Sequence, residues 1–220
     1  MRKKWWKVLT VILLTYSILG ALLFDVPRLA ILNETIRNLH FHVTMWFGMI
    51  ILLTTSAVYA IKYLRSNDID HDHLSVEFAH AGVLFGILGI TTGALWANYA
   101  WGEPWSGDPK QNSSAIALLI YFAYLVLRNS LDDPMQKARI SSIYNIFAFA
   151  TLIPLLFILP RMTDSSLHPG NGGNPGFNAY DLDSRLRLVF YPAVIAWTLL
   201  GVWIVSLRVR IKRLRTVLED

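Results

Sequence analysis

The chain has no cysteine, and only 16% of its 220 residues carry a charged side chain. Without cysteine there is no disulfide, no thiolate ligand for a metal ion and no CxxCH motif for covalent attachment of haem. The few charges are also spread unevenly, because long stretches of the sequence contain none. A soluble domain of this length would intersperse charged and apolar residues, so the distribution indicates a membrane protein.

Six apolar blocks lie along the chain, at about residues 8–24, 43–63, 78–96, 113–127, 140–159 and 188–207. A transmembrane helix needs about 20 apolar residues, and in lipid only a helix satisfies the backbone hydrogen bonds of a single segment. The sequence therefore predicts an all-α integral membrane protein with six transmembrane helices, forming a single membrane domain over residues 1–220. The first block follows a basic start and lacks a small-residue cleavage pattern, so we expect a retained helix and not a signal peptide. The fourth block is short, and we expect its helix to begin inside the preceding loop.

The basic residues predict the orientation of these helices. With the N-terminus inside, 14 of the 20 lysines and arginines fall on the inner side and 6 on the outer side. Inner loops of membrane proteins carry the excess of such residues, so both termini are expected in the cytoplasm. The net charge of +5 then reflects topology and indicates no nucleic-acid partner. The six outer residues are Arg28, Arg37, Lys110, Arg161, Arg185 and Arg187.

The loop between the third and fourth blocks, about residues 97–112, is predicted to be periplasmic and is rich in tryptophan. Trp96, Trp101 and Trp105 lie in it or at its edge, among glycines and prolines that interrupt a helix. Aromatic belts at the lipid headgroups are routine. An irregular loop, however, would not simply lay its rings along a helix surface. The pattern therefore indicates a site for a flat, amphipathic ligand.

Two histidines flank this loop on the outer side, His42 before it and His168 after it. Either one alone would most simply bond to a carbonyl group or to water. Together with the tryptophans, they predict axial ligation of a haem iron by two imidazoles. Each ligand should donate its second ring N–H to an acceptor, for which Asp164 is a candidate at His168. His40 is expected to face solvent.

Two polar residues at the end of the loop each have more than one possible role. Asp108 is placed either to cap the fourth helix or to orient the loop. Lys110 is placed to orient the loop or to meet a haem propionate. The absence of cysteine makes the expected cofactor haem b, bound non-covalently and transiently.

The segment GALWANYAWGEPWSGDPK, residues 93–110, resembles the tryptophan-rich WWD signature of haem-handling cytochrome c biogenesis proteins. Six helices and about 220 residues resemble the CcmC type, the haem exporter protein C. The amino-acid sequence of the motif is closer to that of the CcsA type, whose chains are usually longer. Two features depart from the family pattern. Gly107 stands where a tryptophan usually precedes the aspartate, and the loop before His168 is poor in aromatic residues.

The resemblance implies a function and a set of residues. It implies that haem is held between His42 and His168 on the periplasmic face, against the tryptophan-rich loop. It also implies delivery to a periplasmic haem chaperone of the CcmE type, beside the membrane subunits of an ABC transporter. We expect positioning of haem and not enzymatic turnover. The residues expected around the haem are Trp96, Trp101, Trp105, Asp108 and Lys110.

Three alternatives stay open. The first is a CcsA-type component for haem transport or cytochrome c synthesis. The second is a membrane b-type cytochrome subunit, which needs histidines deep within facing helices. Only His80 lies inside a predicted span, and it is near an end, so the sequence disfavours this reading. The third is a transporter permease, and spans free of charge argue against an ion-coupled pathway.

Overall fold

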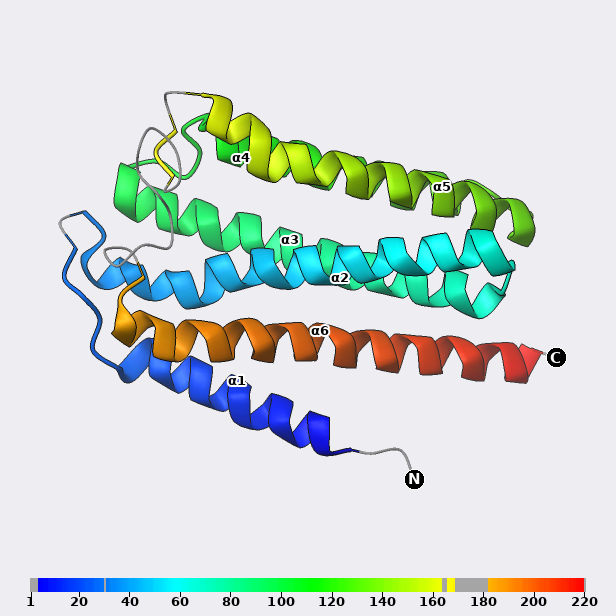
Figure 1. Ribbon diagram of the computed structural model, residues 1–220, viewed down its shortest axis with the longest axis horizontal. Helices are drawn as coiled ribbons and strands as arrows, with labels where there is room; N and C mark the ends of the chain where they lie inside the picture. Colours follow the sequence, from blue (N-terminus) through cyan, green and yellow to red (C-terminus); the bar gives the residue numbers. More distant parts are fainter. Residues whose placement is uncertain (1–3, 30, 164–165, 169–181, 220) are drawn as a thin grey trace.

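The computed structural model describes residues 4–29, 31–163, 166–168 and 182–219, apart from the side chains of residues 215–217 and 219. This part of the chain is helical except for its connections, and its long helices run side by side (Figure 1). A 3-10 turn, η1 (Asn33–Asn38), precedes α2, while a π turn, η2 (Pro154–Ile158), and a 3-10 turn, η3 (Leu159–Met162), extend α5. The long helices are α1 (Trp5–Leu23), α2 (Leu39–Ser66), α3 (Ile69–Trp101), α4 (Pro109–Asn129), α5 (Pro134–Ile153) and α6 (Ser184–Glu219).

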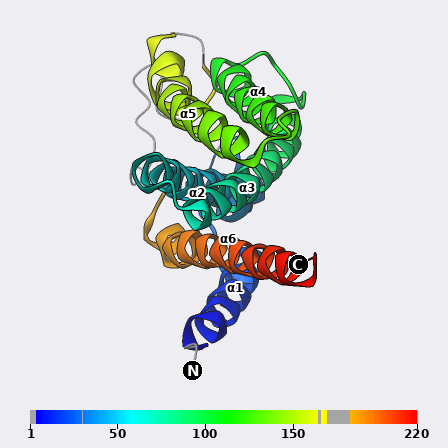
Figure 2. The ribbon, with the colours of Figure 1, turned by 90° about the vertical axis from the view of Figure 1, so that its right-hand side faces the viewer.

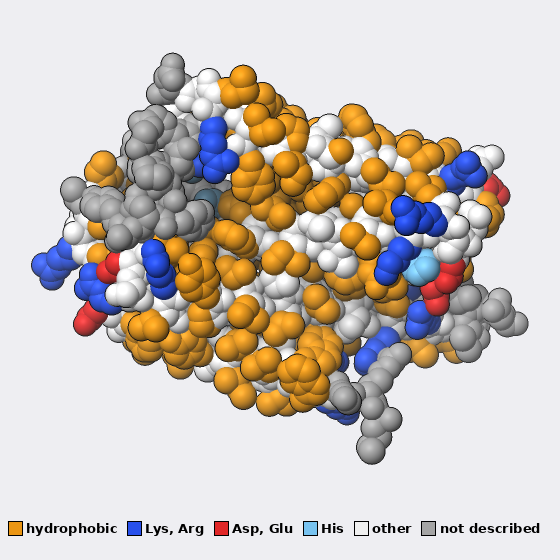
Figure 3. Space-filling model, viewed as in Figure 1, with side chains coloured by type: hydrophobic (Ala, Val, Ile, Leu, Met, Phe, Trp, Pro, Cys, Tyr) orange, Lys and Arg blue, Asp and Glu red, His pale blue; other side chains and the backbone are white. Residues whose placement is uncertain are grey.

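Within the described residues, five helical segments are long and apolar enough to cross a membrane, which confirms the prediction of an all-α protein with several potential spans. Figure 3 shows a broad apolar surface with charged side chains gathered at its two ends. The predicted span at 113–127 lies in α4, which is not among the five. Polar residues from Lys110 to Ser114 fill the first turns of α4 and lower its mean hydropathy. The five segments are Trp5–Leu23, Asn33–Ser66, Ile69–Trp101, Pro134–Met162 and Ser184–Leu214.

The helices form layers when the molecule is viewed along its length (Figure 2). The α2–α3 pair occupies the middle, α4 and α5 lie on one side of it, and α6 lies on the other with α1 beyond it. Buried polar contacts tie the layers together. The side chain of Asn145 in α5 donates to Ser56 of α2 and Ser75 of α3 at 2.7 and 3.0 Å. Arg128 of α4 makes a two-pronged ion pair with Asp72 of α3, at 2.8 and 2.6 Å.

A column of glycines in α3 lets α2 approach closely. Gly82, Gly86, Gly89 and Gly93 recur at helical spacing and lie on one face of α3. A Cβ atom at any of them would come within 3 Å of a side chain from a packed neighbour. The α2 side chains that occupy this column are Leu53 at Gly82, Met49 at Gly86, Trp46 at Gly89 and His42 at Gly93. The column therefore fixes the register of α2 on α3, and His42 is its outermost member.

The tryptophan-rich loop is shorter than predicted. α3 continues to Trp101 and ends at Gly102, whose φ of +88° suits glycine as a helix terminator. α4 begins at Pro109, with Asp108 as its N-cap residue. The irregular segment is therefore Gly102–Asp108, and the predicted bounds of 97–112 are wrong at both ends. The sequence has no helix breaker between Trp96 and Trp101, so α3 extends beyond its apolar block.

Candidate functional site

His42 lies in the first turn of α2 and packs against α3. Its ring Nδ1 is 2.9 Å from the backbone oxygen of Gly89. A carbonyl oxygen can only accept a hydrogen bond, so this contact places the ring proton on Nδ1. The lone pair is then on Nε2, which is the nitrogen that a metal ion would meet. The glycine at position 93 leaves room for this ring, since a Cβ there would lie 2.4 Å from His42 Cε1.

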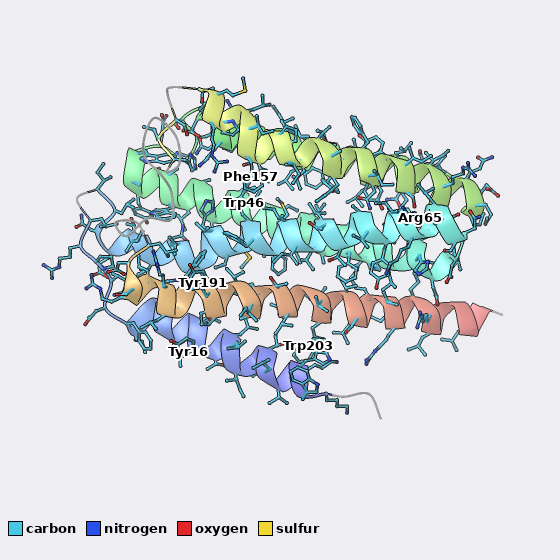
Figure 4. The ribbon with its side chains drawn as sticks, in the orientation of Figure 1. Tyr16, Trp46, Arg65, Phe157, Tyr191 and Trp203 are labelled. Carbon is cyan, nitrogen blue, oxygen red and sulfur yellow. The ribbon has the colours of Figure 1, made fainter. Side chains whose placement is uncertain are left out.

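Two tryptophans hold the His42 ring edge-on from either side. Trp46, one turn along α2, lies 6.3 Å from it between ring centroids, and Trp96 of α3 lies 5.9 Å away. The indole N–H of Trp96 donates to the Thr35 hydroxyl of η1 at 3.0 Å. Figure 4 labels Trp46 toward the end of the molecule that carries the irregular segment, while Arg65 is near the opposite end. His42 is thus a positioned side chain and not a mobile surface histidine.

Asp108 is the polar centre of the site. Its carboxylate is almost fully buried and accepts four hydrogen bonds. One oxygen accepts from the backbone N–H of Lys110 and from the ring of His168, both at 2.8 Å. The other accepts from the Leu167 N–H at 2.7 Å and from the Ser166 hydroxyl at 3.0 Å. Burial alone would raise the pKa of Asp108, but these donors, led by His168, hold the pKa of that carboxyl well below its usual range.

The Asp108 contact sets the orientation of His168. Because an ionised carboxylate only accepts, His168 donates from Nδ1 and is left with its lone pair on Nε2. The ring also stands edge-on to Trp101, with 4.8 Å between centroids. Asp164, the acceptor expected from the sequence, lies outside the described residues, as does the Pro169–Gly176 stretch that follows His168. Asp108 both caps α4 and orients His168.

The first turn of α4 also holds the irregular segment in shape. The Gln111 side chain accepts from the backbone N–H of Ser106 at 3.0 Å and donates to the Pro104 oxygen at 3.2 Å. The Asn112 amide donates to the oxygen of Gly107 at 2.9 Å. Trp105, at the outside of this turn, is 41% exposed. The segment thus presents Trp105 at the surface while its backbone is fixed by side chains from α4.

The structure brings the two candidate ligands to the same end of the molecule. They come from α2 and from the segment after η3, and both rings contact tryptophans of the last turns of α3, His42 at Trp96 and His168 at Trp101. Each has its Nδ1 bonded to an acceptor and each has at least one tryptophan at its edge. Lys110 is half-buried in the first turn of α4, where its backbone N–H donates to the Asp108 carboxylate. This arrangement suits a flat metal complex ligated by two neutral imidazoles.

Other histidines do not join this site. His40 is 2% exposed, so the expectation that it faces solvent is wrong. The first turn of α2 points His40 into the protein, where its Nδ1 has no hydrogen-bond partner among the described residues. His80 lies toward the other end, where its ring is 3.3 Å from the guanidinium of Arg208 in α6. His71 lies in the first turn of α3 and contacts the Ser66 hydroxyl.

Sequence reasoning missed the residues that position the ligands. Gly89 supplies the acceptor for His42, and Gly93 supplies the space for its ring. The signal was present, because glycines spaced by four, three and four residues mark a close helix contact. Ser166 and Thr35 gave no comparable signal, since their roles depend on which segments meet in space.

Comparison with known proteins agrees with the family resemblance. A family model described as "Cytochrome C assembly protein" matches residues 2–168. A relative from Pelargonium hortorum is 40% identical over 95 residues, which cover 42% of this chain and 30% of the relative. One from Thermosynechococcus vestitus is 46% identical over 69 residues, covering 31% of this chain and 22% of the relative. One from Carica papaya is 39% identical over 83 residues, covering 37% and 26%.

These three relatives are all named "Cytochrome c biogenesis protein CcsA". The matched stretch of this chain spans less than a third of the length of each of them. The family model, in contrast, covers well over half of the chain. The chain therefore belongs to the cytochrome c assembly protein family.

Proposed function

We propose that this chain binds haem b non-covalently at its outer end and presents it for the maturation of cytochrome c. His42 and His168 are the axial ligands, and Trp96, Trp101 and Trp105 lie around the macrocycle. The observation that carries the proposal is that the two histidines make the same kind of hydrogen bond and so have the same tautomer. Each donates from Nδ1 to an acceptor at 2.8–2.9 Å and so offers Nε2 to a metal. Haem is the cargo, and the protein holds and orients it.

The relatives favour a CcsA-type component over the CcmC type expected from length. All the relatives compared above carry the CcsA name, and the sequence of the tryptophan-rich motif also favours the CcsA type. The partners expected of the CcmC type, a CcmE-type chaperone and ABC transporter subunits, belong to the alternative proposal. Co-purification of the native complex distinguishes the two types, because only the CcmC type is expected to bind a haem chaperone.

The proposed setting is a bacterial inner membrane with both termini in the cytoplasm. α4 is the sixth span in this arrangement, packed between α3 and α5 with its polar first turns at the outer boundary. The inner ends of the helices then carry the larger share of lysine and arginine. The candidate site and the segment Gly102–Asp108 face the periplasm.

Purification of the full chain and measurement of its absorption spectrum test the proposed function. We expect low-spin haem with two imidazole ligands, all of it extractable with acid–acetone. His42→Ala and His168→Ala should each lose this spectrum, because neither nitrogen has a substitute at the site. His71→Ala, at the opposite end of α3, is the matched control and should leave the spectrum unchanged. Wild-type haem content and spectrum in the His168→Ala variant would rule out paired ligation.

A further inference from the structure

An open pocket of about 270 Å³ lies between the turn η1, the first turn of α2 and the last turns of α3. Its walls are apolar and largely aromatic, formed by Phe41 of α2 and by Leu95, Trp96 and Tyr99 of α3. Tyr99 is 71% exposed and Leu95 is 58% exposed, so the pocket opens on the surface of the protein. Pockets for drug-sized ligands have volumes of about 300–1,000 Å³, so this one suits a compact chemical group.

An ion pair lines the η1 side of this pocket. Arg37 Nε donates to the Oε2 oxygen of Glu34 at 2.7 Å. Arg37 Nη1 donates to the backbone oxygens of Ala21 and Phe24, where α1 ends, at 2.9 and 2.7 Å. Within the described part of the chain, Glu34 Oε1 and Arg37 Nη2 make no hydrogen bond. The pocket therefore offers one acceptor with a negative charge beside one donor with a positive charge.

A stripe of exposed apolar side chains on α3 leads to the pocket. Leu84, Leu88, Leu95 and Tyr99 are all exposed, and their spacings of four, seven and four residues put them on one face of the helix. The last two form part of the pocket wall. The end of α1, the start of α2 and the end of α3 lie at the same end of the molecule (Figure 1). In the proposed membrane setting, the stripe faces acyl chains and the pocket lies near the lipid headgroups.

We propose that this pocket binds the headgroup of phosphatidylethanolamine, with one acyl chain of the lipid along the exposed stripe of α3. The headgroup is a zwitterion, with a primary ammonium group and a phosphate. The ammonium group donates to Glu34 Oε1 beside the aromatic walls, whose ring faces attract a cation. The phosphate accepts from Nη2 of Arg37. A headgroup without an amine matches only the arginine of this ion pair, so the pocket selects the zwitterionic lipid.

The pocket shares Trp96 with the candidate haem site. The indole N–H of Trp96 donates to Thr35, another residue of the pocket lining, at 3.0 Å. The same indole stands edge-on to the ring of His42, with 5.9 Å between centroids. A lipid in the pocket therefore packs against the side chain that flanks a proposed haem ligand. The binding of the lipid itself does not require haem, because none of the groups that contact the lipid is a ligand of the iron.

Native mass spectrometry of the detergent-solubilised full chain tests the proposal, because it counts the lipids that the protein retains. We expect the wild type to retain phosphatidylethanolamine in preference to phosphatidylglycerol with the same acyl chains. Glu34→Gln removes the negative charge that meets the ammonium group, so its binding of phosphatidylethanolamine should fall until the preference is lost. Tyr99→Ala removes one aromatic wall and should weaken the binding of phosphatidylethanolamine roughly three- to tenfold, the range expected of one cation–π contact.

Two matched controls lie outside the pocket. Glu103→Gln removes an exposed carboxylate from the irregular segment before α4. Tyr191→Ala removes a tyrosine of α6 that is also exposed. Neither variant should change the retention of either lipid, since neither residue lines the pocket.

Several outcomes overturn the proposal. Equal retention of the two lipids by the wild type does so, as does unchanged binding of phosphatidylethanolamine in Glu34→Gln or in Tyr99→Ala. Glycerophosphoethanolamine, which has no acyl chains, should compete only weakly. If it competes as well as the whole lipid, the ligand is a soluble amine and not a lipid. A dimer that Tyr99→Ala separates would make the pocket an interface between two copies of the chain. None of these measurements involves haem, so the pocket and the proposed function are tested separately.

Discussion

At the scale of single residues, Asp108 links the start of α4 to the orientation of His168. Asp108→Asn keeps the size of the side chain but replaces one accepting oxygen with a donor, which then faces two donors of the protein. The partners that orient a metal ligand typically contribute a factor of about 10–100 in affinity. We therefore expect Asp108→Asn to weaken haem retention about 10–100-fold, measured by haem titration of the purified chain.

A control isolates this effect. Asp25→Asn makes the same chemical change in an exposed residue of the loop after α1 and should leave the affinity for haem unchanged. Haem affinity of Asp108→Asn equal to that of the wild type would show that Asp108 serves only to cap α4. The far-ultraviolet circular dichroism of both variants shows whether the helices remain intact.

Single residues also show what the sequence could predict about the site. The residue types of His42, His168 and the tryptophans predict a haem site, because few other ligands need two imidazoles beside several flat rings. For the acceptor at His168 the sequence offers Asp164 as a candidate, four residues away. The structure gives this role to Asp108, which is 60 residues away. Contacts over such a separation depend on how α4 and η3 pack, and a single sequence does not contain that information.

At the scale of helices, the packing of α2 against α3 positions the His42 ring. Gly93→Ala would put a Cβ atom 2.4 Å from His42 Cε1, so the ring must move and lose its bond to Gly89. Overpacking of this kind costs roughly 1–3 kcal/mol, which exceeds the gain of about 1 kcal/mol that alanine brings to a helix. We expect Gly93→Ala to lower the thermal stability and to abolish the two-imidazole haem spectrum.

Gly82→Ala is the matched control for this prediction. Its Cβ atom would lie 2.6 Å from Leu53, in the same glycine column but far along α3 from His42. It should lower the thermal stability to a similar degree and leave the haem spectrum unchanged. If both variants keep the wild-type spectrum, the glycine column sets helix packing alone and does not position the ligand.

The sequence predicts the positions of most of the long helices but not the residues at which they begin and end. Blocks without charge predicted the positions of the long helices, because lipid-facing and buried residues alike must be apolar in such a bundle. The ends depend on local chemistry instead. α3 passes its apolar block and stops at Gly102, and α4 starts two residues after Gly107 at its Asp-Pro cap. These terminal turns contain Trp101 and Lys110, so the helix ends that the sequence predicts wrongly lie within the candidate site.

At the scale of the whole molecule, the charges separate into two groups at opposite ends of an apolar surface (Figure 3). α2, α3 and α6 are longer than the roughly 20 residues that cross a bilayer core, so in the proposed membrane setting their ends extend beyond it. The candidate site lies at one end of the molecule and the α4–α5 turn at the other, so the proposed membrane setting puts them on opposite sides of the bilayer (Figure 1).

The proposed orientation of the molecule in the membrane can be measured directly. The chain has no cysteine, so a single introduced thiol reports one position without background. We expect Glu103→Cys, in the exposed segment before α4, to react with a membrane-impermeant maleimide added to intact cells. Ser130→Cys, exposed in the α4–α5 turn, should react only after the membrane is opened. This expectation rests on the excess of 14 to 6 basic residues, which favours the proposed orientation with Ser130 on the cytoplasmic side. Labelling of Ser130→Cys but not of Glu103→Cys in intact cells would reverse the topology, and the proposed periplasmic haem site would have to be abandoned with it.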